Sequence, residues 1–492
     1  MKVFEPKIEV RLVKAIERQE VAPGLGAASN RYRELSDIDL TPYLSEFGGV
    51  RVTKSVREPA GAFSVTLADR EHGALLETLY ALIEPMDLVE IRFAHDPSAY
   101  RDSAGYKLPV IMRGLVSTVV RNESMSGGRP ARTVTVSGQD FGKILQIIQI
   151  FYLNNSVVGD NILSELAFFQ KYAGKDAAKI KTARDFVAGV IERVINPYLA
   201  RMTALADGSK VGAQAINKMM PAVSIEGAVS PYAASNFNNV SLHQFLVALL
   251  DVGPFNELFV EDREEDVALV VRPVPFKDAA GEFIQSYAAA DTLDVPDLDI
   301  VAQNVSRTDA GVANYFWVAS ERWTMMSNED AKRSAQTGVA GNFILYEYPN
   351  CAAAYYGNRK MEVSTALGPE DYAFSDAATK EQQPQETSKL ARWIDRRREV
   401  LAKMNRDNVV FEQGSLRLRG NEAIKAGMYL RILRGATDSI VAECYVSSVT
   451  HDFLPFGSFT TTVSFERGTG FITRAQKAVG DYRFEIDGQG VR

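Results

Sequence analysis

Two stretches of the sequence are nearly alike, and this internal repeat constrains the fold more than any other feature. Residues 86–142 contain the runs MDLVEIRFAHD, KLPVIMRGLVSTVVRNES and RTVTVSGQDFG, and residues 428–470 contain MYLRILRG, SIVAECYVSSVTHDF and SFTTTVSFERGTG. Each set of runs alternates apolar and polar residues between turn residues, which is the pattern of an antiparallel β-meander. The best local match sets residues 115–119 (LVSTV) beside residues 445–449 (YVSSV). The chain therefore carries two copies of one β unit.

A hairpin and a helix are expected before each meander. In the first copy, Pro59 and Gly61 lie between two alternating runs, and this is a turn signal because proline presets its φ and glycine tolerates a positive φ. The predicted order of hairpin, helix and meander is residues 49–69, 72–83 and 86–142 in the first copy, and residues 299–319, 387–405 and 428–470 in the second. Alternation implies that each sheet buries one face, which favours closed or nearly closed antiparallel barrels.

The remainder of the chain is expected to be insertions and connectors, so the fold class is α+β but mainly β. Thr182 opens a predicted helix that ends near Met202, and Asp185 lies where a capping residue would bond. Residues 206–240 are expected to form an extended loop, and the acidic turn at 262–266 is expected to be solvated. The predicted domains are a first β-barrel at 1–140, an α-rich insertion at 141–250, a small β connector at 251–297, a second barrel at 298–319 plus 387–470, a smaller insertion at 320–386, and a C-terminal tail at 471–492.

Composition excludes several classes of protein. The chain has 492 residues and a net charge of −7, which argues against a protein that grips nucleic-acid phosphates, although an acidic wall would suit a channel along which DNA slides. Cys351 and Cys444 stand far apart, so we expect two free thiols and no disulfide framework. No signal peptide and no apolar run long enough to span a membrane is found, so we expect folding in a cytoplasm.

Motifs for catalysis are missing from the sequence. The four histidines have no metal-ligand spacing, and there is no GxSxG elbow, P-loop or GxGxxG motif. Residues 396–398 form an arginine run, but they fall on different faces of their predicted helix, so we expect a solvated surface with side-chain packing. The chain is therefore expected not to be an enzyme and to have no catalytic residues, cofactor or metal site.

Two similar barrels in one chain have a consequence for symmetry. Three chains would place six barrels around one axis, because closed cyclic symmetry needs only one self-consistent contact between neighbours. Such a trimer could join a six-fold partner on one side to a three-fold partner on the other. A symmetry adaptor is thus a function that the repeat itself could supply.

The sequence also resembles a known family, the baseplate hub proteins of contractile-tailed bacteriophages. In the first half the similar segments include VRVTKSVREPAGAFSVTLAD, MRGLVSTVVRNE and RTVTVSGQDFGKIL, and in the second half NELFVEDREEDVALVVRPVPF and RLRGNEAIKAGMYLRI. The resemblance covers residues 50–300 and 340–472. Each motif alone is loose, and the order in which they occur is more specific. The hub half of type VI secretion spike proteins is related to this family.

The resemblance implies a homotrimeric baseplate hub located in the virion, at the tail baseplate, and assembled in the host cytoplasm. Its two barrels would have the tail-tube fold and form a pseudo-hexameric ring that lines the DNA channel without binding DNA specifically. The implied partners are the tail tube or a tube-terminating protein above, the central spike below, and other baseplate proteins around. Alternatives that stay open are a peptidoglycan-degrading hydrolase of the tail tip and the hub of a phage-derived secretion or injection system.

The ring contact is expected along the long strand of each copy. A loop after the second long strand, residues 453–457, is a candidate for partner docking, and folding back onto its own barrel is an equally good interpretation. Helices 73–83 and 387–405 are expected beside their barrels at subunit contacts. The interface candidates are Leu115, Val119, Tyr445, Val449, Phe453, Leu454 and Phe456.

Overall fold

The computed structural model of the chain describes most of its residues. Described are residues 5–14, 18–21, 28–31, 37–44, 48–72, 77–102, 105–126, 129–150, 181–202, 218–229, 240–319, 348–370, 383–434, 439–455 and 457–470. The C-terminal tail expected at 471–492, Phe456, and most of the smaller insertion lie outside these ranges.

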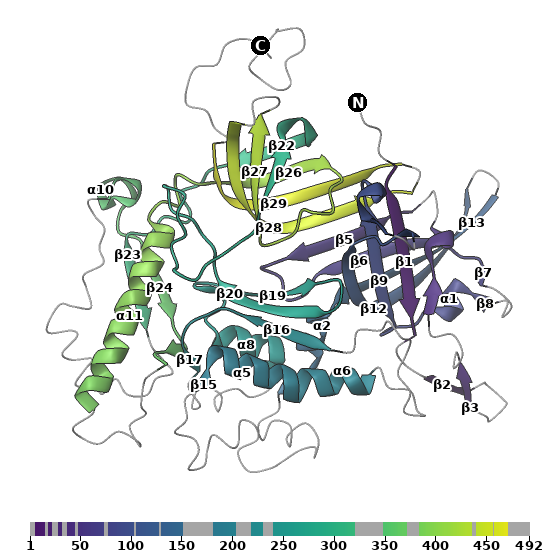
Figure 1. Cartoon of the computed structure of the whole chain (residues 1–492), viewed down its shortest axis with the longest axis horizontal. Coiled ribbons are helices and arrows are strands. Elements are labelled where there is room, and N and C mark those ends of the chain that lie inside the picture. Colours follow the sequence, from purple (N-terminus) through teal and green to yellow (C-terminus); the bar gives the residue numbers. More distant parts are fainter. Residues whose placement is uncertain are drawn as a thin grey trace, which may run out of the picture.

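One sheet of 13 strands organises the molecule (Figure 1). Its path is β22-β26-β29-β28-β5-β6-β13-β12-β9-β1-β4, and β27 joins β28 and β21 off this path. The strands are β1 (Lys7–Val13), β4 (Asp37–Asp39), β5 (Val50–Ser55), β6 (Ala62–Ala68), β9 (Leu88–Ala94), β12 (Val110–Ser126), β13 (Arg129–Asp140), β21 (Thr292–Pro296), β22 (Ile300–Ser306), β26 (Glu412–Arg419), β27 (Tyr429–Arg434), β28 (Ser439–Phe453) and β29 (Phe459–Thr469). The mainly β prediction is confirmed, and no closed barrel is formed by strand pairs among the described residues.

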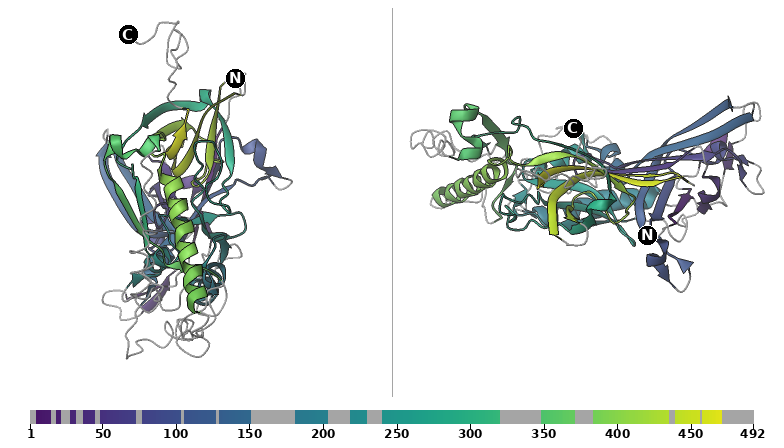
Figure 2. Two further views of the ribbon diagram at one scale, coloured as in Figure 1. Left: turned by 90° about the vertical axis from the view of Figure 1, so that its left-hand side faces the viewer. Right: turned by 90° about the horizontal axis from the view of Figure 1, so that it is seen from above.

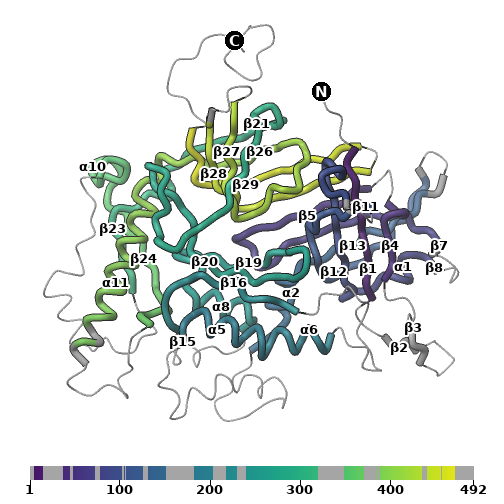
Figure 3. The backbone as a smooth tube through the Cα atoms, viewed as in Figure 1, coloured from purple at the N-terminus to yellow at the C-terminus, as the bar shows by residue number. Residues whose placement is uncertain are grey.

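The two halves of this sheet repeat the same strand order. The first half runs β5-β6-β13-β12-β9 and the second runs β22-β26-β29-β28-β27, and all of these neighbours pair antiparallel. Both meanders predicted from the sequence are therefore present. Figure 3 shows the first-half strands in purple and blue and β26 to β29 of the second half in yellow-green, in two neighbouring groups.

A β-bulge lies at the same place in both long strands. Ser117 in β12 and Ser447 in β28 are each skipped in the ladder to the third meander strand. The flanking pairs are Val116–Gly138 and Thr118–Ser137 in the first half, and Val446–Phe465 and Ser448–Ser464 in the second. A bulge is a specific local feature that bends a strand and re-aims its side chains, so its recurrence supports a true structural repeat.

The turn that enters each meander is also repeated. Met86 donates its backbone N–H to the Val116 carbonyl at 2.8 Å, and Gly427 donates to the Val446 carbonyl at 2.8 Å. Both residues have a positive φ, 76° for Met86 and 87° for Gly427. Glycine adopts this conformation without steric cost, whereas methionine is held there at some cost in strain.

Each half has its own hydrophobic core. The first core collects the inward residues of β1, β5, β6, β9, β12 and β13 with the short helix α1 (Leu79–Leu82). The second collects residues of β21, β22, β26, β27, β28 and β29. Phe453 and Phe459 belong to the first core although they lie on β28 and β29, so the two halves pack against each other at their junction.

Two expected equivalences between the halves are wrong. The partner of β22 in the second hairpin is β26, whereas β23 (Tyr315–Ala319) pairs in parallel with β24 (Lys360–Ser364) in a separate sheet. The long helix α11 (Gln383–Asn405) packs mainly on this separate sheet, through a core that contains Phe316, Leu390 and Ile394. It meets the second half of the main sheet at its last turn, where the Met404 carbonyl accepts from Arg467 of β29 at 2.7 Å. Figure 2 shows α11 standing at one side of the molecule.

The expected α-rich insertion contains helices, and these share a core with the connector and with the first half of the main sheet. Thr182 caps the first long helix as predicted, because its Oγ1 accepts the Asp185 N–H at 3.1 Å. Its helices within the described ranges are α2 (Gly142–Ile147), α5 (Ala183–Val190), a π-helical turn (Ile191–Ile195), α6 (Asn196–Met202) and α8 (Leu242–Leu249). Part of the expected loop at 206–240 is a strand, β16 (Met219–Val223), which pairs in parallel with β20 of the connector.

The connector is a hairpin of β19 (Asn256–Asp262) and β20 (Val267–Pro273), as the sequence predicted. The minor elements are β2 (Arg18–Val21), β3 (Ala28–Arg31), β7 (Glu71–His72), β8 (Glu77–Thr78), β10 (Arg101–Asp102), β11 (Gly105–Tyr106), β14 (Gln149–Ile150), β15 (Lys181–Thr182), β17 (Ala228–Val229), β18 (Val240–Ser241), β25 (Leu367–Gly368), α10 (Ala353–Tyr356) and 3-10 turns at 41–43, 97–100, 297–299 and 349–351. Among the helices described here, none is long and apolar enough to cross a membrane.

Candidate functional site: the seam and the free edges

The two halves of the sheet are joined where β28 pairs antiparallel with β5. We call this contact the seam. It runs from Ser448 opposite Ser55 to Phe453 opposite Val50. In Figure 1 the seam is where the yellow strands meet the purple ones. It makes one continuous sheet from two repeats.

Side chains add to the backbone pairing of the seam. The hydroxyls of Thr53 and Thr450 lie 3.0 Å apart, within hydrogen-bonding distance. Arg51 donates to both carboxylate oxygens of Asp452, at 2.6 and 3.3 Å. Directly opposed pairs of this kind stabilise a sheet by about 0.2–1 kcal/mol each.

The length of β28 lets it hold two neighbours on one edge. Its first part pairs with β27 as far as Tyr445, and its last six residues pair with β5. The bulge at Ser447 separates the two stretches, and its carbonyl accepts the Val56 N–H at 3.0 Å. Beyond the bulge, β28 keeps β29 of its own half on one edge and takes β5 of the other repeat on the opposite edge.

An aromatic cluster fills the space beneath the seam. The Phe93 ring lies 5.0 Å from that of Phe459 and 6.2 Å from that of Phe453. His451 is buried beside them, with its Nδ1 3.0 Å from the Thr461 hydroxyl. Burial among apolar groups lowers the pKa of His451 to about 4, so its imidazole is neutral at pH 7.

The connector hairpin contacts both repeats, next to the seam, through buried charges. The Tyr445 hydroxyl donates to the Glu257 carboxylate, whose oxygens lie 2.6 and 2.7 Å away, and Arg272 pairs with the same carboxylate at 3.2 Å. On the first half, the Arg113 guanidinium donates to the carbonyls of Arg263 and Glu264. Burial raises the pKa of Glu257, and the arginine and tyrosine offset that effect.

The acidic turn at 262–266 is solvated at its tip, where residues 263–265 are exposed as expected, but it is anchored at its base. Asp262 is only 6% exposed. The Glu264 carboxylate accepts from Arg92 at 2.9 Å. The turn is anchored because its carbonyls and carboxylates satisfy arginines of the first repeat, which a sequence pattern of clustered acids does not show.

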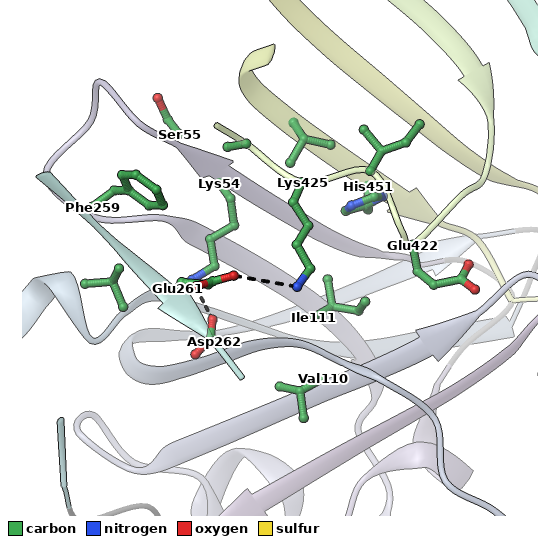
Figure 4. Close-up of a pocket in the computed structure, with 14 residues that line it drawn as sticks. Lys54, Ser55, Val110, Ile111, Phe259, Glu261, Asp262, Glu422, Lys425 and His451 are labelled. Atoms are coloured by element: carbon green, nitrogen blue, oxygen red, sulfur yellow. Dashed lines mark ion pairs between the residues drawn. The ribbon is translucent and has the colours of Figure 1, made fainter. Parts of the chain in front are cut away.

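Lys54 of β5 lies between two buried carboxylates. Its Nζ is 2.7 Å from Asp140. It is 2.6 Å from Asp262, and Figure 4 marks this second ion pair. Burial would lower the pKa of Lys54, but the two carboxylates raise it overall, so the ammonium stays charged. The pKa of Asp262 is raised by its burial. The three side chains come from β5, the end of β13 and the end of β19, so this cluster ties the first repeat to the connector.

The pocket beside this cluster lies at the junction of both repeats and the connector. Its lining includes Val110, Phe259, Lys425 and His451, and its open volume is about 560 Å³. In Figure 4, Glu261 and Lys425 face each other across it, with a Nζ–Oε1 distance of 3.8 Å. Groups of three or more His, Cys, Asp or Glu that could hold a metal are absent from the residues that the structure describes.

The same edge that forms the seam in the second repeat is bare in the first. Residues 118–126 of β12 follow the equivalent bulge and pair with β13 on one side only, within the described part of the chain. The strand equivalent to β5 in the second repeat is β22, and among described residues it pairs only with β26. We call these two stretches the free edges. Both are largely exposed, with Val120 44% and Val301 54% exposed.

The interface candidates from the sequence fall into different places. Leu115, Tyr445, Val449 and Phe453 are buried inside the chain, Val119 is half-buried, and Leu454 is 49% exposed. Phe456 lies outside the described residues. Val449 and Phe453 belong to the seam, and Val119 belongs to a free edge. Their role in contacts between chains stays a prediction.

Several seam residues were not singled out from the sequence. The pairing of β28 with β5 joins positions about 400 residues apart, and no local pattern reports such a contact. One signal was available for Lys54, a charged residue in an alternating strand, but alternation alone does not distinguish a buried charge from an exposed one.

Comparisons with known proteins find likeness in structure only. No family model matches the sequence, and no curated protein sequence matches it. A tail protein from Neisseria meningitidis MC58 is 8% identical with a TM-score of 0.39, covering 94% of this chain and 97% of that one. The 43 kDa tail protein of prophage MuSo2 from Shewanella oneidensis is 11% identical with a TM-score of 0.40, covering 94% and 96%.

A third similar structure is a component of the type VI secretion system of Escherichia coli, described as similar to bacteriophage T4 tail proteins. It is 8% identical with a TM-score of 0.33, covering 85% of this chain and 72% of that one. The structural neighbours of this chain are thus phage-tail and type VI secretion proteins, the same groups that the sequence resemblance named.

Proposed function

We propose that the chain is a structural hub of a contractile phage tail, and that its free edges join copies of it into a ring. The observation that carries this proposal is the seam. One repeat contacts the other through two strand edges, and the equivalent edges of β12 and β22 are both without a partner strand among the described residues. In a ring, the free edge of β12 on one subunit receives β22 of the next. Each subunit then meets its neighbour in the way that its own two repeats meet each other.

The repeat predicts the register of this contact. Moving the seam pairs onto their equivalent positions sets Asn122 opposite Asn304 of the next subunit, where the seam has Asp452 opposite Arg51. Val120 then faces Ser306, as Thr450 faces Thr53. The two asparagines can bond to each other through their amides, and no like charges are opposed.

A ring of three chains contains six repeats. Six similar units can continue a six-fold tail tube, while the three-fold symmetry of whole chains matches a central spike. Each half of the sheet would then complete a tail-tube-like barrel within the ring, with the DNA channel at the centre. The net charge of −7 favours passage of DNA over its capture. The tail tube, the spike and surrounding baseplate proteins are the proposed partners, in the virion tail.

Disulfide trapping tests the register. We expect an Asn122→Cys and Asn304→Cys double variant to form disulfides between chains, because directly opposed strand residues lie within disulfide range. Non-reducing electrophoresis should show dimers and trimers that disappear on reduction. The native cysteines are both buried and should not contribute.

The matched control shifts the register by one residue. In an Asn122→Cys and Gln303→Cys variant the two side chains point to opposite faces of the sheet, so cross-linking should fall at least about tenfold. Equal cross-linking of the two variants, or none in either, would count against the proposed contact.

A further inference from the structure

A second pocket lies far from the seam, beside helix α11. It is open, with a volume of about 740 Å³, and it is lined by residues of α11, of the connector and of the segment after it. Apolar surfaces from Trp393, Ile284 and Val400 form part of the wall, and Arg396, Arg397 and Lys403 bring cationic groups to it. The ring proposed above uses none of these residues.

Arg397 is the unusual group in this pocket. The sequence predicted a solvated arginine run, but Arg397 is only 7% exposed. Its guanidinium carbon lies 4.7 Å from the centre of the Phe255 ring and 4.6 Å from that of Trp393. Two rings therefore flank the guanidinium, and its in-plane N–H groups are the part left for hydrogen bonds.

The described residues offer those N–H groups no hydrogen bond. Nε is fully enclosed without a partner. The nearest carboxylate, Asp251, is 3.7 Å from Nη2, and it accepts instead from the Thr365 hydroxyl at 2.5 Å and the Ala366 N–H at 2.6 Å. Burial lowers the pKa of Arg397 from its ordinary value, and the nearby carboxylates of Asp251 and Glu226 offset part of that effect.

The other cations of the pocket are already paired at its mouth. Arg396 lies 3.1 Å from Glu226, and Lys403 lies 2.7 Å from Glu399. Both are about half exposed. Arg397 is thus the one buried cation of the lining whose hydrogen-bonding capacity is unmet by described residues. Its contacts are the ion pair with Asp251 and the two rings, and a buried charged donor that makes no hydrogen bond is costly, so such a group calls for an explanation.

We propose that this pocket binds a carboxylate attached to an apolar body, with Arg397 as its anchor. A planar carboxylate matches the edge formed by the two Nη groups, which unlike Nε are not fully enclosed, and can bond it in bidentate fashion. The apolar body would lie on Trp393, Ile284 and Val400. Glu226 and Glu399 at the mouth disfavour a doubly charged phosphate. Such a carboxylate could be the C-terminus of a partner polypeptide or a free organic acid.

Titration calorimetry on the full chain tests the proposal with 3-phenylpropionate and its uncharged amide. We expect the acid to bind at least tenfold more tightly than the amide, and more tightly than inorganic phosphate. Arg397→Met should weaken binding of the acid at least tenfold. Arg392→Met, an exposed arginine on the same helix, should leave it unchanged.

Two further arms complete the experiment. A decapeptide ending in free phenylalanine that binds at least tenfold better than 3-phenylpropionate would identify a chain terminus as the source, and equal affinities would identify a free acid. If Arg397→Met does not fold, the comparison of acid with amide in the unaltered protein decides. Equal binding of acid and amide, tighter binding of phosphate, or no binding of the acid at 10 mM would overturn the proposal.

Discussion

The same strand edge is covered in one repeat and bare in the other. In the second repeat, the residues after the bulge are Thr450, His451 and Phe453, and they pack against β5 and the aromatic cluster. In the first repeat the equivalent positions are Val120, Arg121 and Glu123, all exposed. A chain with two copies makes this strand contact once, at the seam. The two equivalent edges, on β12 and on β22, are left without a partner strand among the described residues. The seam therefore shows, within the same molecule, how each bare edge can pair with a strand.

The largest expected effect comes from removing the charge that holds β5 to the connector. Lys54→Met leaves Asp140 and Asp262 buried without their cation, which should cost about 3–5 kcal/mol of unfolding free energy at pH 7. Urea unfolding of the isolated chain measures this. Lys425→Met, at an exposed site, is the control and should cost less than about 0.5 kcal/mol. A loss of under 1 kcal/mol for Lys54→Met would break the account of the covered edge.

Acid should weaken the covered edge through His451. The folded pKa of about 4 lies below the ordinary value of 6.5, so the stability it contributes is complete above pH 6.5 and is lost as the pH falls through 4. The contribution is up to about 3 kcal/mol. Subtracting the unfolding free energies of a His451→Gln variant from those of the unaltered protein across this range isolates it. A flat difference would contradict a buried neutral imidazole.

One substitution at equivalent positions sharpens the comparison of the two edges. Thr450→Lys forces a charge into the covered edge and should cost about 1–2 kcal/mol in the isolated chain. Val120→Lys is exposed and should cost less than about 0.5 kcal/mol there, yet it should reduce cross-linking of the Asn122 and Asn304 cysteine pair several-fold. Equal destabilisation of the isolated chain by the two lysines would contradict the difference between a covered and a bare edge.

The smallest effect is expected at the exposed rung of the seam. Asp452→Asn removes the ion pair with Arg51, whose side chain is 65% exposed, so the cost should be about 0.2–1 kcal/mol and should shrink in 1 M salt. Urea unfolding at two salt concentrations measures it. A larger cost, or one that salt does not change, would mean that this pair is less solvated than its exposure indicates.

Local patterns predicted the meanders, the connector hairpin and the capped helix at Thr182, because strand alternation and helix caps depend on residues that are close together in the sequence. The partner of β22 was misassigned because β26 lies more than 100 residues further along, and the nearer β23 also alternates. Long-range antiparallel pairing depends on which edges meet in space, and a local turn signal does not encode that.

The candidate site was predicted only in part. The similarity of residues 115–119 and 445–449 marked the long strands, and the structure added a shared bulge within both. The buried charges at Lys54, Glu257 and Arg397 were missed, because a charged residue in a strand, a turn or a helix is most often solvated, and only the surrounding fold decides otherwise.

The central claim is that the bare edges close into a ring in the register of the seam. Electron microscopy of the disulfide-locked Asn122→Cys and Asn304→Cys protein tests it most directly, because the lock holds the proposed contact while leaving the number of subunits free. The account predicts closed rings of three chains with six lobes around a central hole. Open chains, helical filaments or rings of another number would contradict it.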